Sequence, residues 1–385
     1  MYLIDSNIFS YTLLDINQES IYMKKLSLNS VHESVGAYFT PISGWSVPSS
    51  YGDQSSEYNS VRSEAGIVDL SSRGKLILSG KDHLKFLQGM LSNDVVKLQE
   101  GKGMYATILT VKGRMVSDMR VYKDKESVLI DLEPGLNSKV SELLSKYKLS
   151  YKADIQDVTE ILGLISVQGP KSKKLLEKLF EEQIPEMKEY DFVKKKFRGS
   201  EIIVVYVNRT GEMGYDLYIE NEYLKPLWEE LMRAGSALNI EPVGYDALNT
   251  LRIEAGIPVY NIDMDESNIP IEAGLWSALN FEKGCYVGQE VIARIKWRGH
   301  VNWHLVGFTL QSGYSSSAGD EIYKVEKKIG RVTSSVFSPM LKTSICLGYI
   351  RREFNKPGTG VVIKTSEDSE IEAEVRELPF YRGSF

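Results

Sequence analysis

The chain has 385 residues, of which 42% are apolar and 25% are charged, and its formal net charge is −6. This length exceeds one ordinary hydrophobic core, so we expect two or three domains. The small acidic excess argues against a dedicated nucleic-acid surface, and no apolar run reaches the roughly 18 residues that a membrane-spanning helix needs. Two cysteines are too few for a disulfide framework, which favours a cytoplasmic protein.

The first residues differ in character from the rest of the chain. Residues 1–20 lack the basic start and the unbroken apolar stretch of a secretory signal. A second methionine, Met23, is followed by two lysines. We therefore expect residues 1–23 to be an extension outside the folded core.

Alternating and helical patterns then predict a compact block between residues 74 and 155. The turn at residues 112–114 is expected to join two of its strands as a β-hairpin. The predicted elements are a strand at Gly74–Gly80, a helix from Asp82 to Leu91, strands at Met104–Val111, Met115–Tyr122 and Ser127–Asp131, and a helix at Leu136–Tyr147.

The pattern restarts after this block and changes again near residue 303. From Trp303 onward, nearly all the predicted elements are short strands, which indicates a β-barrel or sandwich. The mixed order of strands and helices favours an α+β protein. The elements before residue 303 are a strand at Ile161–Val167, a helix that begins at Pro170 and continues through Leu179, a hairpin of Glu201–Val207 with Gly214–Glu220, and helices at Leu224–Ala234 and Val243–Ala255.

Several short segments form a motif series whose order along the chain is informative. They are Ser43–Pro48, Val61–Leu70, Gln168–Pro170, Asn208–Gly211, Asp263–Asp265, Phe337–Pro339 and Pro379–Tyr381. Each is weak alone, but together they resemble the T-protein of the glycine cleavage system over roughly residues 28–385. The resemblance implies a three-domain cloverleaf around a central folate channel, with tetrahydrofolate as cofactor. It implies a folate-binding domain of residues 24–73 plus 157–285, a second α+β domain of residues 74–156, and a C-terminal β-barrel domain of residues 286–385.

One segment departs from this resemblance. Residues 283–290 read KGCYVGQE, and the T-protein has an acidic residue where Cys285 stands. The segment is similar to the signature of the YgfZ-type folate-binding proteins, which assist iron-sulfur enzymes and are linked to tRNA modification. We therefore predict a tetrahydrofolate-dependent accessory factor for assembly or repair of iron-sulfur proteins, with iron-sulfur client proteins as partners and Cys285 as the working thiol.

Three alternatives remain open beside this prediction. The first is an aminomethyltransferase, which takes an aminomethyl group from a lipoyl carrier protein and forms methylenetetrahydrofolate; Asp118 and the terminal segment Pro379–Tyr381 favour it. The second is a folate-dependent demethylase with the same pocket. The third is a folate sensor or scaffold without catalysis.

Folate chemistry indicates the candidate residues. A pterin needs carboxylates that accept from its N–H groups, its glutamate tail needs cations, and its rings need apolar or aromatic walls. Asp118 shares a strand face with Arg120, and the resemblance implies that it is the catalytic aspartate beside the folate nitrogens. The plain alternative is a surface ion pair with Arg120, worth under about 1 kcal/mol.

The resemblance implies further folate contacts, each with a structural alternative. Asp216 stands where the T-protein has a glutamate that holds the pterin, but it could be a solvated strand-face carboxylate. Arg252 would lie near the folate, or on the surface of its helix. Tyr105 would line the folate channel, or fill the core.

The basic residues near Cys285 complete the candidate set. Lys283 is a candidate folate contact and could also lower the thiol pKa of Cys285; an inert, packed thiol is the alternative. Residues 294–300 mix cations with an aromatic residue. We interpret them as a solvated loop that also steers the folate glutamate tail, rather than as a nucleic-acid site. We expect no metal site at His300 and His304, because a strand is predicted there and residues four apart on a strand lie far from each other. We expect Cys346 in the core.

Overall fold

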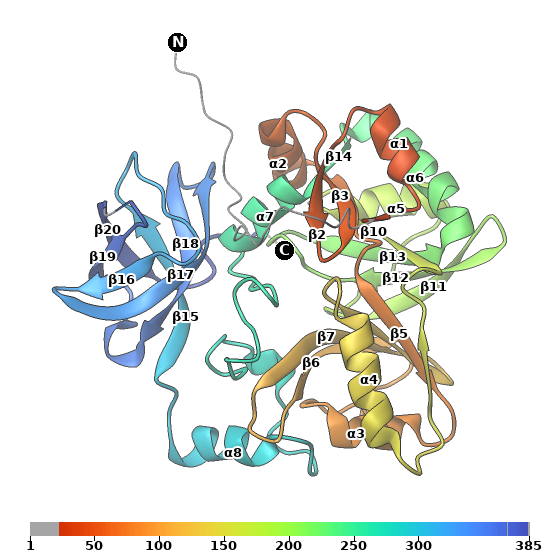
Figure 1. Cartoon of the computed structure of the whole chain (residues 1–385). Coiled ribbons are helices and arrows are strands. Elements are labelled where there is room, and N and C mark those ends of the chain that lie inside the picture. The colour runs from red at the N-terminus through yellow and green to blue at the C-terminus, as the bar shows by residue number, and fades with distance from the viewer. Residues whose placement is uncertain (1–22, 368, 384–385) are drawn as a thin grey trace.

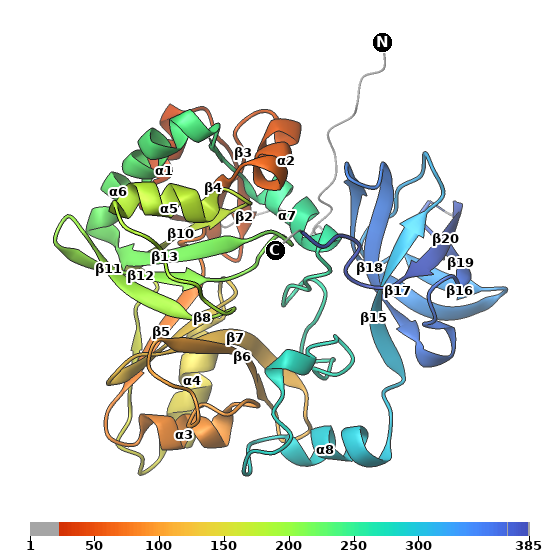
Figure 2. The ribbon, with the colours of Figure 1, turned by 180° about the vertical axis from the view of Figure 1, so that it is seen from behind.

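The computed structural model describes residues 23–367 and 369–383 of the chain. The predicted N-terminal extension lies outside these residues, apart from Met23. Two α+β lobes and a β-barrel make up the molecule, as Figure 1 and the reverse view in Figure 2 show. The prediction of an α+β fold with a C-terminal barrel is confirmed. Within the described ranges, no helix is both long enough and apolar enough to cross a membrane.

The first lobe contains a six-stranded sheet with the strand order β11-β12-β13-β10-β4-β14. The predicted hairpin is confirmed, since β12 and β13 are antiparallel neighbours. The edge strand β11 was missed because three consecutive lysines hide its alternation. The strands are β4 (Gly66–Asp69), β10 (Leu162–Gln168), β11 (Phe192–Phe197), β12 (Ser200–Tyr206), β13 (Gly214–Glu220) and β14 (Glu241–Pro242).

Five helices and a small sheet pack around this lobe. In α6, apolar residues recur at helical spacing, and Leu224, Leu227 and Leu231 are fully buried against the sheet core. The small sheet is β1 (Lys24–Lys25), β2 (Tyr38–Ile42) and β3 (Trp45–Ser50). The helices are α1 (Asn29–Ser34), α2 (Gln54–Ser63), α5 (Ser172–Phe180), α6 (Asn221–Gly235) and α7 (Tyr245–Glu254), with a 3₁₀ turn at Ser236–Leu238.

The second lobe contains a five-stranded sheet with the order β6-β7-β8-β5-β9. The elements predicted for this block are all present, within a few residues at their ends. In the β6–β7 hairpin, Tyr105 lies opposite Arg120 and Thr107 opposite Asp118. The elements are β5 (Gly74–Ser79), α3 (His83–Met90), β6 (Lys102–Leu109), β7 (Met115–Lys123), β8 (Ser127–Leu132), α4 (Asn137–Lys148) and β9 (Asp154–Asp157).

A long segment after α7 belongs to the core of the second lobe. It includes the 3₁₀ turn Trp276–Ala278 and helix α8 (Gln289–Arg298). The loop predicted for residues 294–300 was wrong, because Ile292 and Ile295 pack inward and make this stretch helical. The predicted domain division assigns residues 260–301 partly to the first domain and partly to the barrel. Their packing leads us to propose that they join the second domain.

The third lobe is a closed barrel with the strand order β15-β18-β17-β16-β19-β20. Cys346 is fully buried in β18, as predicted. After the barrel, the chain returns to the first lobe, where the Tyr381 and Gly383 amides donate to the carbonyls of Glu254 and Gly211. The strands are β15 (Trp303–Leu310), β16 (Glu321–Lys324), β17 (Lys327–Ser338), β18 (Thr343–Arg351), β19 (Gly360–Lys364) and β20 (Glu370–Arg376), with a 3₁₀ turn at Arg352–Phe354.

Candidate functional site

A cavity of about 640 Å³ lies where the two α+β lobes meet the C-terminal tail. Its wall is formed by strand β7 of the second lobe, helix α7 of the first lobe, and residues 379 and 381–383, among others. This volume falls within the range of about 300–1,000 Å³ that is usual for small-molecule sites. The position explains why segments from distant parts of the sequence share one site.

Aromatic residues form much of the cavity wall. Tyr105 and Tyr190 stack with their ring centroids 6.4 Å apart and their planes 21° apart. Tyr245, Tyr260 and Tyr381 line other parts of the wall. Flat rings of this kind suit a planar heterocyclic ligand that also needs hydrogen bonds at its edges.

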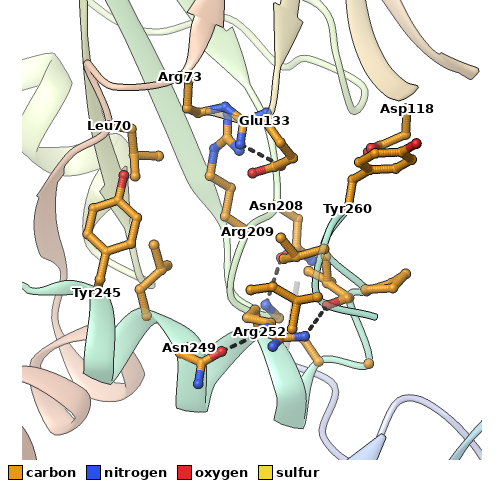
Figure 3. Close-up of a pocket in the computed structure, with 18 of the residues that line it drawn as sticks. Leu70, Arg73, Asp118, Glu133, Asn208, Arg209, Tyr245, Asn249, Arg252 and Tyr260 are labelled. Carbon is orange, nitrogen blue, oxygen red and sulfur yellow. Dashed lines mark hydrogen bonds and ion pairs between the residues drawn. The ribbon is translucent and has the colours of Figure 1, made fainter. Parts of the chain in front are cut away.

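Asp118 presents a carboxylate to this cavity from the middle of β7. The residue is 5% exposed, and the Tyr105 hydroxyl donates to its Oδ2 at 2.7 Å. Its Oδ1 is buried and has no hydrogen-bond partner among the described residues. Burial, together with the nearby Glu133 carboxylate, raises the pKa of Asp118 to about 6. Figure 3 shows Asp118 across the cavity from Asn249 and Arg252.

Behind the wall, three arginines surround the fully buried Asp131. Arg73 Nε lies 2.6 Å from Asp131 Oδ1, and Arg209 Nη2 lies 3.0 Å from Oδ2. Arg120 Nη1 lies farther away, at 3.6 Å from Oδ2. Burial alone would raise the pKa of Asp131, but the arginines hold it well below its usual value. Arg73 also binds Glu133 at 2.6 Å, a pair visible in Figure 3.

Asp216 lies behind the cavity wall rather than on it. Its side chain is fully buried, and Arg209 Nε donates to both carboxylate oxygens at 3.0 and 3.1 Å. Arg209 itself lines the cavity. Asp216 is thus not among the described residues that line the cavity, and it binds Arg209, which is. Because Asp216 is fully buried, the alternative of a solvated strand-face carboxylate is wrong.

Arg252 lines the cavity but is already engaged by protein groups. From α7, its Nε donates to Asn249 Oδ1 at 2.9 Å, and its Nη2 donates to Ser334 Oγ of the barrel at 2.7 Å. Its Nη1 forms a buried ion pair with Asp263. Figure 3 shows Arg252 and Asn249 side by side on the helix. Arg252 therefore joins the first lobe to the barrel at the edge of the cavity.

Lys283 and Cys285 are not among the described residues that line the cavity. The Lys283 ammonium donates to three backbone carbonyls, those of Gln88, Leu91 and Asn93, at 2.7–2.8 Å. Burial lowers the pKa of Lys283 to about 8. Cys285 is a free, exposed thiol. The lysine thus anchors its loop to the end of α3 and is not free for a folate contact.

Several residues of the cavity were missed by the analysis of the sequence, among them Arg73, Glu133 and Arg209. Arg73 directly precedes β5 and Glu133 directly follows β8, and these strands are antiparallel neighbours whose ends meet. That pairing is the signal that would have found them. Arg209 lies within Asn208–Gly211, a segment that supports the family resemblance but from which no site residue was predicted.

Lobes and cavity together define a multidomain α+β protein with a C-terminal barrel and a cavity where its lobes meet. Residues 28–283 match the model of the GCVT N-terminal domain, and residues 304–382 match that of the glycine cleavage T-protein C-terminal barrel domain. The chain belongs to the glycine cleavage T-protein family.

Individual relatives extend this match over almost the whole chain. An aminomethyltransferase of Caldanaerobacter subterraneus subsp. tengcongensis is 31% identical over 366 residues, covering 94% of this chain and 97% of the relative. An aminomethyltransferase of Halothermothrix orenii is 32% identical over 364 residues, covering 93% and 100%. The crystal structure of glycine cleavage system aminomethyltransferase T from Bartonella henselae has the same fold, with a TM-score of 0.87 at 23% identity over 94% of this chain and 99% of that chain.

These findings correct the predicted function. The prediction of a YgfZ-type accessory factor for iron-sulfur proteins was wrong, because the relatives that match over the full length are aminomethyltransferases. The eight-residue segment that led to it has a structural explanation instead. Lys283 anchors the loop, and Cys285 lies on the exposed surface away from the cavity lining.

Proposed function

We propose that the protein is a tetrahydrofolate-dependent aminomethyltransferase. It would take the aminomethyl group from the lipoyl arm of a carrier protein and form methylenetetrahydrofolate. In this reaction the carbon–sulfur and carbon–nitrogen bonds of the aminomethyl group break, and its carbon forms one bond to N5 and one to N10 of folate. Each of these two nitrogens loses its proton: one proton goes to the lipoyl sulfur, and the other leaves with the ammonia. Membership of a family whose relatives are named aminomethyltransferase supports the proposal.

The single observation that carries the proposal is the unpaired oxygen of Asp118. This Oδ1 is buried in the cavity wall and has no partner within the described part of the chain. A buried acceptor without a donor is unfavourable, so a ligand that donates an N–H group there is favoured. A reduced pterin has such an N–H group at N5, which is one of the two folate nitrogens that receive the one-carbon unit.

Asp118 would then act through its charge. Because its pKa is about 6, the group is mostly ionised at neutral pH. A carboxylate fixed in a dry site stabilises positive charge that develops on an adjacent nitrogen. Tyr105 holds Oδ2 in place, so Oδ1 stays directed to the ligand.

The other predicted folate residues take more limited roles in this proposal. Tyr105 supplies an aromatic wall and orients Asp118. Arg252 offers the face of its guanidinium group, since its donors already bind protein partners. Asp216 positions Arg209, which lines the cavity. Arg382, which is exposed and also lines the cavity, suits the anionic glutamate tail.

The test is one-carbon transfer with purified components. The protein is mixed with a lipoyl carrier bearing an aminomethyl group made from labelled glycine, and with tetrahydrofolate. Ammonia and labelled methylenetetrahydrofolate should appear in equal amounts. Asp118→Asn should slow the reaction by roughly 10²- to 10⁴-fold. The matched control is Asp154→Asn, which changes an exposed aspartate of the same lobe and should leave the rate unchanged.

Two results would contradict the proposal. One is the absence of ammonia release by the wild-type protein when the carrier and folate are both present. The other is full activity of Asp118→Asn. Redox-neutral transfer of a methyl group from an N-methylated amine to folate, giving 5-methyltetrahydrofolate without any lipoyl carrier, would favour the demethylase alternative instead.

A further inference from the structure

Arg120 is the one arginine around Asp131 for which the described residues leave donors unused. It lines the cavity from β7 and is 8% exposed. Its Nε and Nη1 are buried and have no hydrogen-bond partner in the part of the chain that the structure describes. The 3.6 Å between Nη1 and Asp131 Oδ2 is too long for a hydrogen bond. Arg73 and Arg209, by contrast, bind Asp131 at 2.6 and 3.0 Å.

Unused buried donors of a charged group are costly, so such groups normally have an acceptor. The carboxylate of Asp131 is already shared by two other arginines, and it cannot approach Arg120 without leaving them. The acceptor for Arg120 must therefore come from whatever enters the cavity. This acceptor is an oxygen or nitrogen atom with a free lone pair.

Arg120 and Asp118 impose complementary demands on the same ligand. They are two residues apart on β7 and so face the same side of the sheet. Among the described residues, Asp118 Oδ1 has no donor, and Arg120 Nε and Nη1 have no acceptor. The ligand must present a donor and an acceptor on one edge. In a tetrahydropterin, N5–H and the 4-oxo oxygen occupy neighbouring positions on one edge of the ring system.

We propose that Arg120 donates to the 4-oxo oxygen of the reduced pterin while Asp118 accepts from N5. The inference rests on the proposed function and adds an orientation to it: the edge with N5 and the 4-oxo group faces β7. Arg120 is then a specificity-determining residue that selects an oxo group and rejects an amino group at position 4, because an amino group would point a donor at a cation.

The experiment compares tetrahydrofolate with its 4-amino analogue by calorimetry and by quenching of tryptophan fluorescence under anaerobic conditions. We expect the wild-type protein to bind the 4-oxo ligand roughly 10- to 100-fold more tightly, the usual effect of one hydrogen bond to a charged group. Arg120→Met should weaken binding of the 4-oxo ligand by a similar factor and change binding of the 4-amino ligand little. The preference between the two ligands should therefore disappear.

Two controls make this loss specific. Arg120→Met leaves Asp131 with two arginine partners, so the fold should persist, and Arg120→Lys keeps a donor and should retain part of the preference. Arg382→Met removes another arginine of the cavity. It should weaken the binding of both ligands equally and leave the preference for the 4-oxo ligand intact. A tailless ligand, 6-methyltetrahydropterin, should show the same loss with Arg120→Met as tetrahydrofolate.

The outcomes separate the two proposals. If the wild-type protein binds neither folate nor its analogue, the proposed function fails, and this inference fails with it. If both ligands bind equally well, or if Arg120→Met weakens both alike, only the contact with the 4-oxo oxygen is overturned. It is also overturned if the effect of Arg120→Met vanishes with the tailless ligand, because Arg120 would then hold the glutamate tail.

Discussion

The hydroxyl of Tyr105 donates a hydrogen bond of 2.7 Å to Oδ2 of Asp118 across strands β6 and β7. The hairpin pairs Thr107 with Asp118, so Tyr105 is the diagonal neighbour of Asp118 on the same face. This bond holds one carboxylate oxygen and leaves the other to the cavity. The hairpin therefore orients one carboxylate oxygen of Asp118 as a hydrogen-bond acceptor toward the cavity.

The first prediction concerns the acid limb of the pH profile. If ionised Asp118 is needed for transfer, kcat/KM should rise with pH around the Asp118 pKa of about 6. The Tyr105 hydrogen bond lowers that pKa, so Tyr105→Phe should move the acid limb to higher pH. Initial rates of methylenetetrahydrofolate formation between about pH 5 and about pH 8 test this. An acid limb that stays in place in Tyr105→Phe would show that another group controls it.

The same pKa has a consequence for stability. The pKa of Asp118 is raised above its unfolded value of about 3.9, so its contribution to stability is present below about pH 4 and is lost as the pH rises through about 6. Asp118→Asn should remove this slope from a plot of the free energy of unfolding against pH. Urea denaturation in that pH range measures it.

The second prediction concerns the buried pair of Arg209 and Asp216. Arg209→Met leaves the Asp216 carboxylate buried without a cation and should lower the free energy of unfolding by about 3–5 kcal/mol. Asp216→Asn keeps the side-chain volume and removes that charge, so it should lower the free energy of unfolding by less than Arg209→Met does. Arg376→Met breaks an exposed ion pair and serves as the control without a measurable effect. Equal stability of the Arg209→Met and Arg376→Met proteins would refute a structural role for the buried pair.

The third prediction concerns Lys283. Lys283→Met leaves three carbonyls at the end of α3 without their donor and should lower the free energy of unfolding by about 2 kcal/mol. Because burial lowers the folded pKa to about 8, the unfolded chain binds more protons between about pH 8 and about pH 10. Stability of the wild-type protein should therefore rise with pH over this interval, and Lys283→Met should abolish that rise. Denaturant titrations at several alkaline pH values decide the matter.

The fourth prediction concerns Cys285. Its thiol is exposed and is not among the described residues that line the cavity, so Cys285→Ser should transfer the one-carbon unit at the wild-type rate. Asp118→Asn is assayed in parallel as the positive control, because the loss of this cavity residue should lower the transfer rate. A marked loss of transfer in Cys285→Ser would mean that the thiol takes part in the reaction.

Local patterns predicted much of the fold. The block from β5 to α4 and the β12–β13 hairpin follow from alternation, helical spacing and turn residues, all of which act between close neighbours in the chain. Helix α8 was missed because most of its residues are polar or basic. Only two isoleucines, Ile292 and Ile295, mark the side that packs against the core. In the site, one cavity is lined by three residues that the family resemblance indicated, Asp118, Tyr105 and Arg252. Their contacts with folate stay predictions.

What the sequence determined by itself is the α+β order of elements, the C-terminal barrel and the likeness to the glycine cleavage T-protein family. These depend on local periodicity and on short motifs in a fixed order. The tertiary structure alone decided that Arg209 lines the cavity while Asp216 binds it, and that Lys283 binds backbone carbonyls. It also decided that Arg120 has donors without a partner among the described residues. A carboxylate or an ammonium group binds the partners that the fold brings nearest, and those partners here are 7 to 195 residues away along the chain.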